Sequence, residues 1–258
     1  MKNVSTGRFI RGLVLCLFVG LAGCVWFRLL EIKNQLADFD ENIRVEVVER
    51  HFILKFLNPV LLSDDFVYLS KLRPSRIETL AGGGYRWFLD FHLDPNLERD
   101  LKSRIVSFSM TWTQKHKLTA FGFSPLFLEM APPAFLEASI RSLGVGKVDQ
   151  DKKQLKVDPE DLPRITARLP RLGDITRVMG PPLERKTEDG LMLLVYRFKA
   201  DASPVDKEYE DRKIAEARLY FDIGRDELVR LKGRFAGLKL SIDYRKLMAA
   251  SGGDDPVE

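Results

Sequence analysis

A strict alternation of apolar and hydroxyl-bearing residues between positions 106 and 113 is the feature that most constrains the fold of this chain. The apolar positions are Val106, Phe108, Met110 and Trp112, and the alternate positions are Ser107, Ser109, Thr111 and Thr113. Neighbouring side chains of a β-strand point to opposite faces of the sheet, so this segment is predicted to be a strand with one buried face. Sheets with one solvated face are commonly antiparallel, and an antiparallel sheet is therefore expected.

Similar but shorter patterns predict the other strands and helices. The predicted strands cover 87–93, 118–123, 194–198, 217–221 and 228–235, with hairpins at 44–56 and 145–157. The predicted helices cover 26–38, 64–71, 132–143, 160–169 and 174–179, with Ser63 as the N-cap of the second and Gly144 closing the third. Residues 82–84 are all glycine, and because a strand follows them they are expected to form a hairpin loop.

The order of these elements in the first half of the chain recurs in the second half at an offset of about 107 to 110 residues. This recurrence predicts an α+β fold made of two tandem similar units, each an antiparallel sheet packed by one or two helices. The units are expected at 41–144 and 145–248. A segment at 24–40 with a short helix precedes them, and a flexible tail at 249–258 follows.

The N-terminus carries a basic start, with Lys2, Arg8 and Arg11, and a short apolar run that ends in Leu21-Ala22-Gly23-Cys24. The run at 12–20 is too short to span a bilayer, which takes about 20 apolar residues in a helix. The four residues at its end resemble the lipobox of bacterial lipoproteins. The resemblance implies that residues 1–23 are a signal peptide and that Cys24 is acylated. Val25, in place of an aspartate, implies an outer-membrane lipoprotein that faces the periplasm.

An uncleaved signal anchor is the alternative interpretation of the same segment. Residues 12–27 are almost entirely apolar, and the polar tether that usually follows a lipobox is missing. The helix expected at 26–38 also leaves two possibilities open: it lies on the membrane beside the lipid, or it packs on the folded body. The lipoprotein and the signal-anchor interpretations both place the folded part outside the cytoplasm.

Charge, cysteine and histidine content exclude several classes of function. The net charge is +4, but removing the signal peptide takes away three cations and no acids, which leaves a net charge near +1. Nucleic-acid binding therefore lacks its main electrostatic argument. Cys16 would leave with the signal peptide and Cys24 would carry the lipid, so no disulfide is expected. His51, His92 and His116 have no metal-ligand spacing, and neither a metal nor another cofactor is expected.

A second resemblance covers about residues 160–235. Val178-Met179-Gly180-Pro181-Pro182 follows a predicted helix, Tyr196 lies in the next predicted strand, Leu219-Tyr220-Phe221-Asp222 in the one after, and Leu228-Val229 in the last. This order is similar to the SmpA/OmlA-type domain of small outer-membrane lipoproteins such as BamE. The resemblance implies a non-enzymatic binding module that takes part in the assembly or maintenance of the outer membrane, and it supplies no site residues.

Three functions are weighed on these grounds. The first is a lipid-anchored binding or scaffold module for an envelope protein, with Trp87, Phe88, Phe121 and Phe123 as candidate contacts, of which at least two would be exposed. Helices that cover both faces of the sheet would instead bury these side chains. The second is a periplasmic carrier of an apolar ligand or lipid, because 17 phenylalanines could line a cleft between sheet and helices.

The third function is a hydrolase that uses paired carboxylates, drawn from Glu129, Asp158, Glu160 and Asp161. The acidic residues at 158–161 lie where helix N-caps are expected, and no Ser-His-acid or Cys-His set has a suitable context. We therefore predict no catalytic residues and no enzymatic activity.

Overall fold

The computed structural model describes residues 25–93, 104–149, 154–157 and 162–249. The first half contains β1 (Ile43–Val48), β2 (His51–Phe56), β3 (Arg76–Thr79), β4 (Tyr85–Leu93), β5 (Ile105–Trp112) and β6 (Leu118–Phe123). The second half contains β9 (Glu184–Glu188), β10 (Leu191–Ala200), β11 (Ile214–Asp222), β12 (Glu227–Phe235) and β13 (Leu238–Asp243). Two short strands, β7 (Lys147–Asp149) and β8 (Gln154–Lys156), form a separate hairpin.

The helices of the described residues are mostly short. The N-terminal helix covers residues 25–37. It is followed by α2 (Phe39–Asn42), α3 (Ser63–Ser70), α4 (Pro125–Met130), α5 (Pro133–Val145), α6 (Leu172–Met179) and α7 (Tyr244–Leu247), and by a 3-10 helix at Lys207–Lys213. Among the described residues, no helix combines the length and the hydropathy needed to cross a bilayer.

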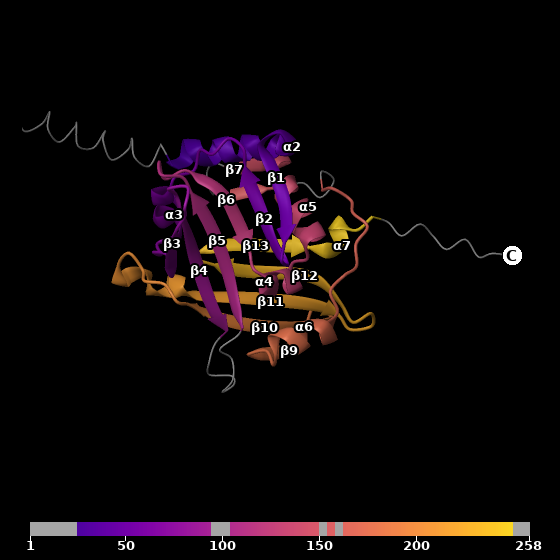
Figure 1. Cartoon of the computed structure of the whole chain (residues 1–258). Helices are drawn as coiled ribbons and strands as arrows, with labels where there is room; N and C mark the ends of the chain where they lie inside the picture. Colours follow the sequence, from indigo (N-terminus) through magenta and orange to yellow (C-terminus); the bar gives the residue numbers. More distant parts are fainter. Residues whose placement is uncertain (1–24, 94–103, 150–153, 158–161, 250–258) are drawn as a thin grey trace, which may run out of the picture.

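Eleven strands form one antiparallel sheet that contains both halves of the chain. The order is β1-β2-β6-β5-β4-β10-β11-β12-β13, with β3 paired to β4 and β9 paired to β10. In Figure 1 the strands β1, β2, β4, β5 and β6 run steeply through the view, whereas β10 to β13 cross it nearly horizontally. The sheet therefore curls, and its strand direction turns sharply between β4 and β10.

The prediction of an α+β fold made of two tandem similar units is wrong, because the described residues form mainly one curled antiparallel sheet with few helices. Strand β4 pairs with β10 through Leu93↔Phe198, His92↔Lys199 and Phe91↔Ala200. One hydrophobic core also includes buried side chains from both halves. An unpaired strand at the edge of each half would expose its backbone N–H and C=O groups, and the β4–β10 pairing removes both edges at once. The recurring order of elements thus describes two parts of one sheet.

Several local predictions are confirmed. The alternating segment forms β5, whose residues alternate between partly exposed and buried along its whole length. The hairpin at 44–56 forms with Glu49 and Arg50 as its turn, at φ values of 49° and 63°. Positive φ at both turn residues is the geometry of the type I′ hairpin, whose twist matches that of the strands. The helices at 26–38 and 132–143 and the hairpin at 145–157 also form, within a few residues of their predicted bounds.

Other local predictions fail for identifiable reasons. The helix expected at 160–169 is absent at 162–169, where Ile165 donates its N–H to the Leu247 carbonyl, 2.8 Å away. Pro163 and Pro170 bound this stretch, and the residue before a proline disfavours helical geometry. The N-cap of α3 is Leu62 and not Ser63, because the Asp65 carboxylate accepts the Leu62 N–H at 2.9 Å.

The helices lie on one face of the sheet, which we call the core face, and the opposite face is the outer face. Helix α4 packs on β2 and β5, α5 contacts β13 and α7, and α7 packs on β12.

Cys24 and the signal peptide, the acidic residues at 158–161 and the tail at 250–258 lie outside the described residues. The predictions that concern them are not tested by the structure.

Candidate functional site

A connected network of eight phenylalanine rings occupies the core face and joins the two halves of the sheet. Its members are Phe52, Phe91, Phe108, Phe121, Phe123, Phe127, Phe198 and Phe235. They come from six strands, four in the first half and two in the second, and from helix α4. The network is therefore a property of the whole sheet and could not form in either half alone.

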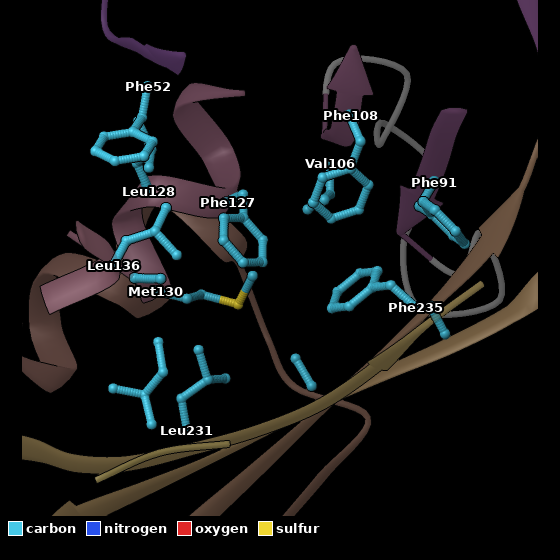
Figure 2. Close-up of a cluster of buried hydrophobic side chains, with 14 of the residues drawn as sticks. Phe52, Phe91, Val106, Phe108, Phe127, Leu128, Met130, Leu136, Leu231 and Phe235 are labelled. Atoms are coloured by element: carbon cyan, nitrogen blue, oxygen red, sulfur yellow. The ribbon is translucent and has the colours of Figure 1, made fainter. Parts of the chain in front are cut away.

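Phe108 lies at the centre of this network. Its ring centroid is 5.3 Å from that of Phe127 on α4 and 5.5 Å from that of Phe235 on β12, in edge-to-face geometry. Phe91 also approaches Phe235 edge-on at 5.3 Å. Figure 2 shows Phe235 rising from the sheet of the second half toward Phe91 and Phe108, with Phe127 facing them from the helix. Such aromatic pairs contribute about 0.5–1.5 kcal/mol each beyond their buried area.

The aromatic network is not fully shielded from solvent. Phe121 and Phe123 lie on the core face, where they pair with Leu54 and Phe52 across β6 and β2. Phe52 is 0% exposed and Leu54 5%, whereas Phe121 and Phe123 both remain partly exposed. Solvent thus reaches the core face at Phe121 and Phe123 on β6, whereas their neighbours Phe52 and Leu54 on β2 are buried.

Helix α4 is the element that fills the core face above β5. Its side chains Phe127, Leu128 and Met130 are buried, and its C-terminal neighbour Ala131 precedes two prolines that separate α4 from α5. The hydroxyl of Tyr244 on α7 donates a hydrogen bond to the Met130 carbonyl. Complete burial raises the pKa of Tyr244 far above its ordinary value, so this hydroxyl stays protonated and able to donate.

A groove of about 360 Å³ opens beside α4. Its lining includes Val47 and Arg50 from the β1–β2 hairpin, Leu128 and Glu129 from α4, Asp174 and Ile175 from α6, and Pro125, Pro132, Pro133 and Pro170. Leu128 is 9% exposed and Ile175 1%, and both belong to the main core. The floor of the groove is therefore the hydrophobic core itself.

An ion pair crosses the rim of this groove. The Arg50 guanidinium lies 2.5 Å from the Glu129 carboxylate and ties the hairpin turn to α4. The Arg50 side chain is 75% exposed, so solvent screens the pair and its contribution to stability is small. This contact can open at little energetic cost.

The four aromatic residues predicted as partner contacts do not lie together. Trp87 is 9% exposed and belongs to the main core, on the same face as Phe121 and Phe123. Phe88 points to the outer face, where the guanidinium of Arg76 lies 3.6 Å from its ring centroid. Three of these residues thus line the core face, and Phe88 alone among them faces the other side.

A second groove, of about 530 Å³, lies on the outer face of the first half. Its floor is formed by small and hydroxyl-bearing side chains of β5 and β6, among them Ser107, Ser109, Thr119 and Gly122. Phe88 lines one side of it. Charged, hydroxyl-bearing and apolar side chains all line this groove, and the sheet separates it from the aromatic network.

The histidines and acidic residues that the structure describes do not cluster into a metal site. Within the described ranges, no group of three or more His, Cys, Asp or Glu side chains could hold a metal ion. The Nδ1 atom of His116 lies 3.4 Å from the Ser63 hydroxyl. Ser63 is only 2% exposed, so a substrate cannot reach this hydroxyl. Glu129 is engaged by Arg50, and the acidic residues at 158–161 lie outside the described residues.

Comparison with known proteins gives no relative: no protein family, no curated protein and no solved structure matches this chain. The resemblances to the lipobox and to the SmpA/OmlA-type domain stay predictions.

Proposed function

We propose that this protein is a lipid-anchored envelope protein that binds an apolar ligand between the core face of its sheet and helix α4. The observation that carries this proposal is the groove beside α4, whose floor at Leu128 and Ile175 is the main hydrophobic core. An apolar ligand that enters there passes from water into the aromatic network without crossing a polar layer. Ligand sites in proteins are typically concave, mostly apolar and of this size.

The energetics favour a ligand with a long acyl chain. To reach the aromatic network, the ligand must displace buried side chains of α4, namely Phe127, Leu128 and Met130. Burial of each contributes about 1.5–3 kcal/mol, so the displacement costs roughly 5–9 kcal/mol. A chain of about ten methylene groups recovers a similar amount, at ~0.8 kcal/mol for each buried group. A small apolar molecule would not offset the cost.

Helix α4 is suited to such a displacement. It has six residues, and Pro132 and Pro133 interrupt the backbone hydrogen bonding between it and α5. Two side-chain contacts hold α4 to its neighbours: the exposed Arg50–Glu129 ion pair at the rim of the groove and, inside the core, the hydrogen bond from Tyr244 to the Met130 carbonyl. Few backbone hydrogen bonds must therefore break when α4 moves.

Membrane attachment through Cys24 completes the proposal. Acylation of Cys24 would hold the protein at a bilayer surface, where long-chain ligands are concentrated. The residues before Val25 carry the lipobox-like pattern on which this part depends, and Val25 favours the outer membrane. The absence of a catalytic set among the accessible described residues is compatible with binding without turnover.

A binding module for an envelope protein is the second candidate function. Strand β1 is an edge of the sheet, and its last residues Val47 and Val48 are 57% and 50% exposed. An exposed edge strand can accept a further strand from a partner, which supplies main-chain hydrogen bonds. This function would use the hairpin edge and not the aromatic network.

The test is photochemical labelling of the full-length protein in its native membranes with a diazirine-bearing, alkyne-tagged fatty acid. We expect labelled peptides that contain α4 and β6. Val47 lines the groove beside α4 and Val48 lines the groove on the outer face, so a matched pair of variants is available. Val47→Trp should fill the groove and reduce labelling of α4, while Val48→Trp on the same strand should leave it unchanged.

Val47 is 57% exposed and Val48 50%, so a tryptophan at either position should not disturb folding. Label found only outside α4 and β6, or reduced equally by the two variants, would contradict an acyl site on the core face. Capture of a partner through β1 with no label on α4 would favour the second candidate.

A further inference from the structure

The N-terminal helix (residues 25–37) is held on the body by polar contacts of Arg28, Lys33 and Gln35. The Arg28 Nε donates to the Asp65 carboxylate at 2.6 Å, and Asp65 is 2% exposed. The Lys33 ammonium donates to the Gly144 carbonyl at 3.1 Å, and Gln35 is 4% exposed. These contacts fix the rotation of the helix about its axis.

The solvent-exposed side of this helix changes from apolar to polar along its length. Phe27, Glu31 and Asn34 are exposed, and the helical period places them on one side. Phe27 is 72% exposed, the highest value among the exposed large apolar side chains of the described residues. Trp26 and Leu30 are partly exposed, and neither packs against the main core or the smaller one. Phe27, Trp26 and Leu30 thus lie together in the first six residues of the helix, and Ile32 is a further partly exposed apolar residue outside both cores.

We infer that Trp26, Phe27 and Leu30 form a membrane-contact patch, which inserts into the surface of the bilayer that holds the acylated Cys24. This inference rests on the proposed lipid anchor and adds to it the face that the protein turns toward the membrane. Consecutive Cα atoms are at most about 3.8 Å apart, so Trp26 lies within roughly 8 Å of the lipidated residue.

That distance is comparable to the depth of about 5–10 Å at which interfacial helices bury their apolar side chains. Tryptophan is enriched at this level of the membrane. The polar residues Glu31 and Asn34 follow one and two turns later, so the patch ends where the helix leaves the interface. The position of the patch directly after the anchor is what selects a bilayer as the occupant over a protein partner.

The chain contains three tryptophans, which makes the patch directly measurable. Trp87 is 9% exposed and Trp112 1%, so both are shielded from lipid, whereas Trp26 is not. Full-length protein purified from membranes is reconstituted into phosphatidylcholine vesicles whose acyl chains are brominated. We expect a partial loss of tryptophan emission relative to unbrominated vesicles. Trp26→Phe should abolish this loss, and Trp87→Phe should preserve it.

A matched pair of polar substitutions tests the apolar contact itself. Phe27→Ser should weaken the quenching of Trp26 by brominated lipid. Ile223→Ser is the control, because Ile223 is 54% exposed in the turn between β11 and β12. In Figure 1 the indigo N-terminal helix runs along the top of the molecule and the β11–β12 region lies well below it.

Intact mass of the same preparation separates the patch from the anchor. An acylated Cys24 without bromine quenching of Trp26 would overturn the patch and leave the anchor standing. An unmodified, unprocessed N-terminus would overturn the anchor and the patch with it. An acylated protein whose quenching disappears only in Trp26→Phe and weakens in Phe27→Ser is the expected result.

Discussion

The outer faces of the two halves of the sheet differ, although their core faces are continuous. In the first half the outer face of β5 carries Ser107, Ser109 and Thr111 and lines an open groove. In the second half the outer face carries a small apolar cluster, with every member 4% exposed or less: Leu193, Val195, Tyr220 and Val229. The side chains of Arg230 and Lys232 lie over the Tyr220 ring, at 4.9 and 5.4 Å from its centroid.

The two halves are alike on the core face and differ on the outer face. Both supply side chains to the aromatic network on the core face, which is the proposed ligand site. The outer face of the first half opens into a groove, whereas the outer face of the second half carries a buried apolar cluster at Leu193, Val195, Tyr220 and Val229. Substitutions on the two faces of the two halves should therefore have very different effects.

The largest effect is expected from the core face. Phe235 on β12 contacts rings from β4, β5, α4 and β10, and is 6% exposed. Phe235→Ala should destabilise the protein by about 3–5 kcal/mol, because it leaves a cavity where the halves meet. Denaturant unfolding measured separately by fluorescence and far-UV circular dichroism should show one shared transition. Two transitions, with only one shifted, would indicate that the halves unfold independently.

Substitutions on the two outer faces should change the stability of the protein by different amounts. Leu193→Ala, in the apolar cluster of the second half, should cost about 2–5 kcal/mol because Leu193 is 0% exposed. Ser109→Ala, on the outer face of the first half, should change stability by less than about 0.5 kcal/mol. Thermal unfolding of the two variants checks the difference. Equal effects would mean that the two outer faces are not specialised.

Alkaline pH should lower the free energy of unfolding through Tyr196, on the core face of the second half. Burial raises the pKa of Tyr196 from 10.0 to about 12, and its hydroxyl donates to the Gly180 carbonyl at 3.0 Å. Below pH 10 the hydroxyl is neutral in the folded and the unfolded state. Between pH 10 and 12 the unfolded state ionises first, so the free energy of unfolding falls over that interval.

Tyr196→Phe should reduce this alkaline loss, and it should lower stability near pH 8 by about 1 kcal/mol through the lost hydrogen bond. Stability curves of the variant and the parent protein from pH 8 to 12 provide the measurement. A parent protein with constant stability up to pH 12 would refute the assignment.

The smallest effect is expected at the rim of the groove. Arg50→Ala removes the exposed ion pair with Glu129 and should cost only about 0.2–1 kcal/mol. Labelling of α4 by the photoactivatable fatty acid should stay the same or increase, since the contact that restrains α4 is lost. A clear decrease would mean that Arg50 itself binds the ligand, for example through a carboxylate.

The sequence predicts strands well where one face is buried and the other is solvated. The alternation around Phe108 identifies β5, and the turn at Glu49-Arg50 identifies the β1–β2 hairpin. It fails for β9, whose residues Glu184–Glu188 are nearly all charged and carry no apolar period. It also fails for α4, which is too short for a helical period and lies directly between β6 and two prolines.

The candidate site depends on pairing that no local pattern contains. Strands β4 and β10 meet across about a hundred residues of chain, and nothing in either segment specifies the other as its partner. Without this pairing, the second-half ring of Phe235 could not be placed beside Phe91 and Phe108. The sequence predicts Phe121 and Phe123 as partner contacts and not as members of an aromatic core.

The most direct test of one continuous sheet is a disulfide across the β4–β10 pairing. His92 and Lys199 are Cα partners in this register, so His92→Cys with Lys199→Cys should form an intramolecular disulfide in the full-length protein, detected by peptide mass spectrometry. Arg86→Cys with Lys199→Cys is the control, because Arg86 lies six residues, or about 20 Å, further along β4. A bond in the first pair and none in the second is the predicted result. No bond in the first pair, in protein that remains folded, would contradict the shared sheet and the ligand site built on it.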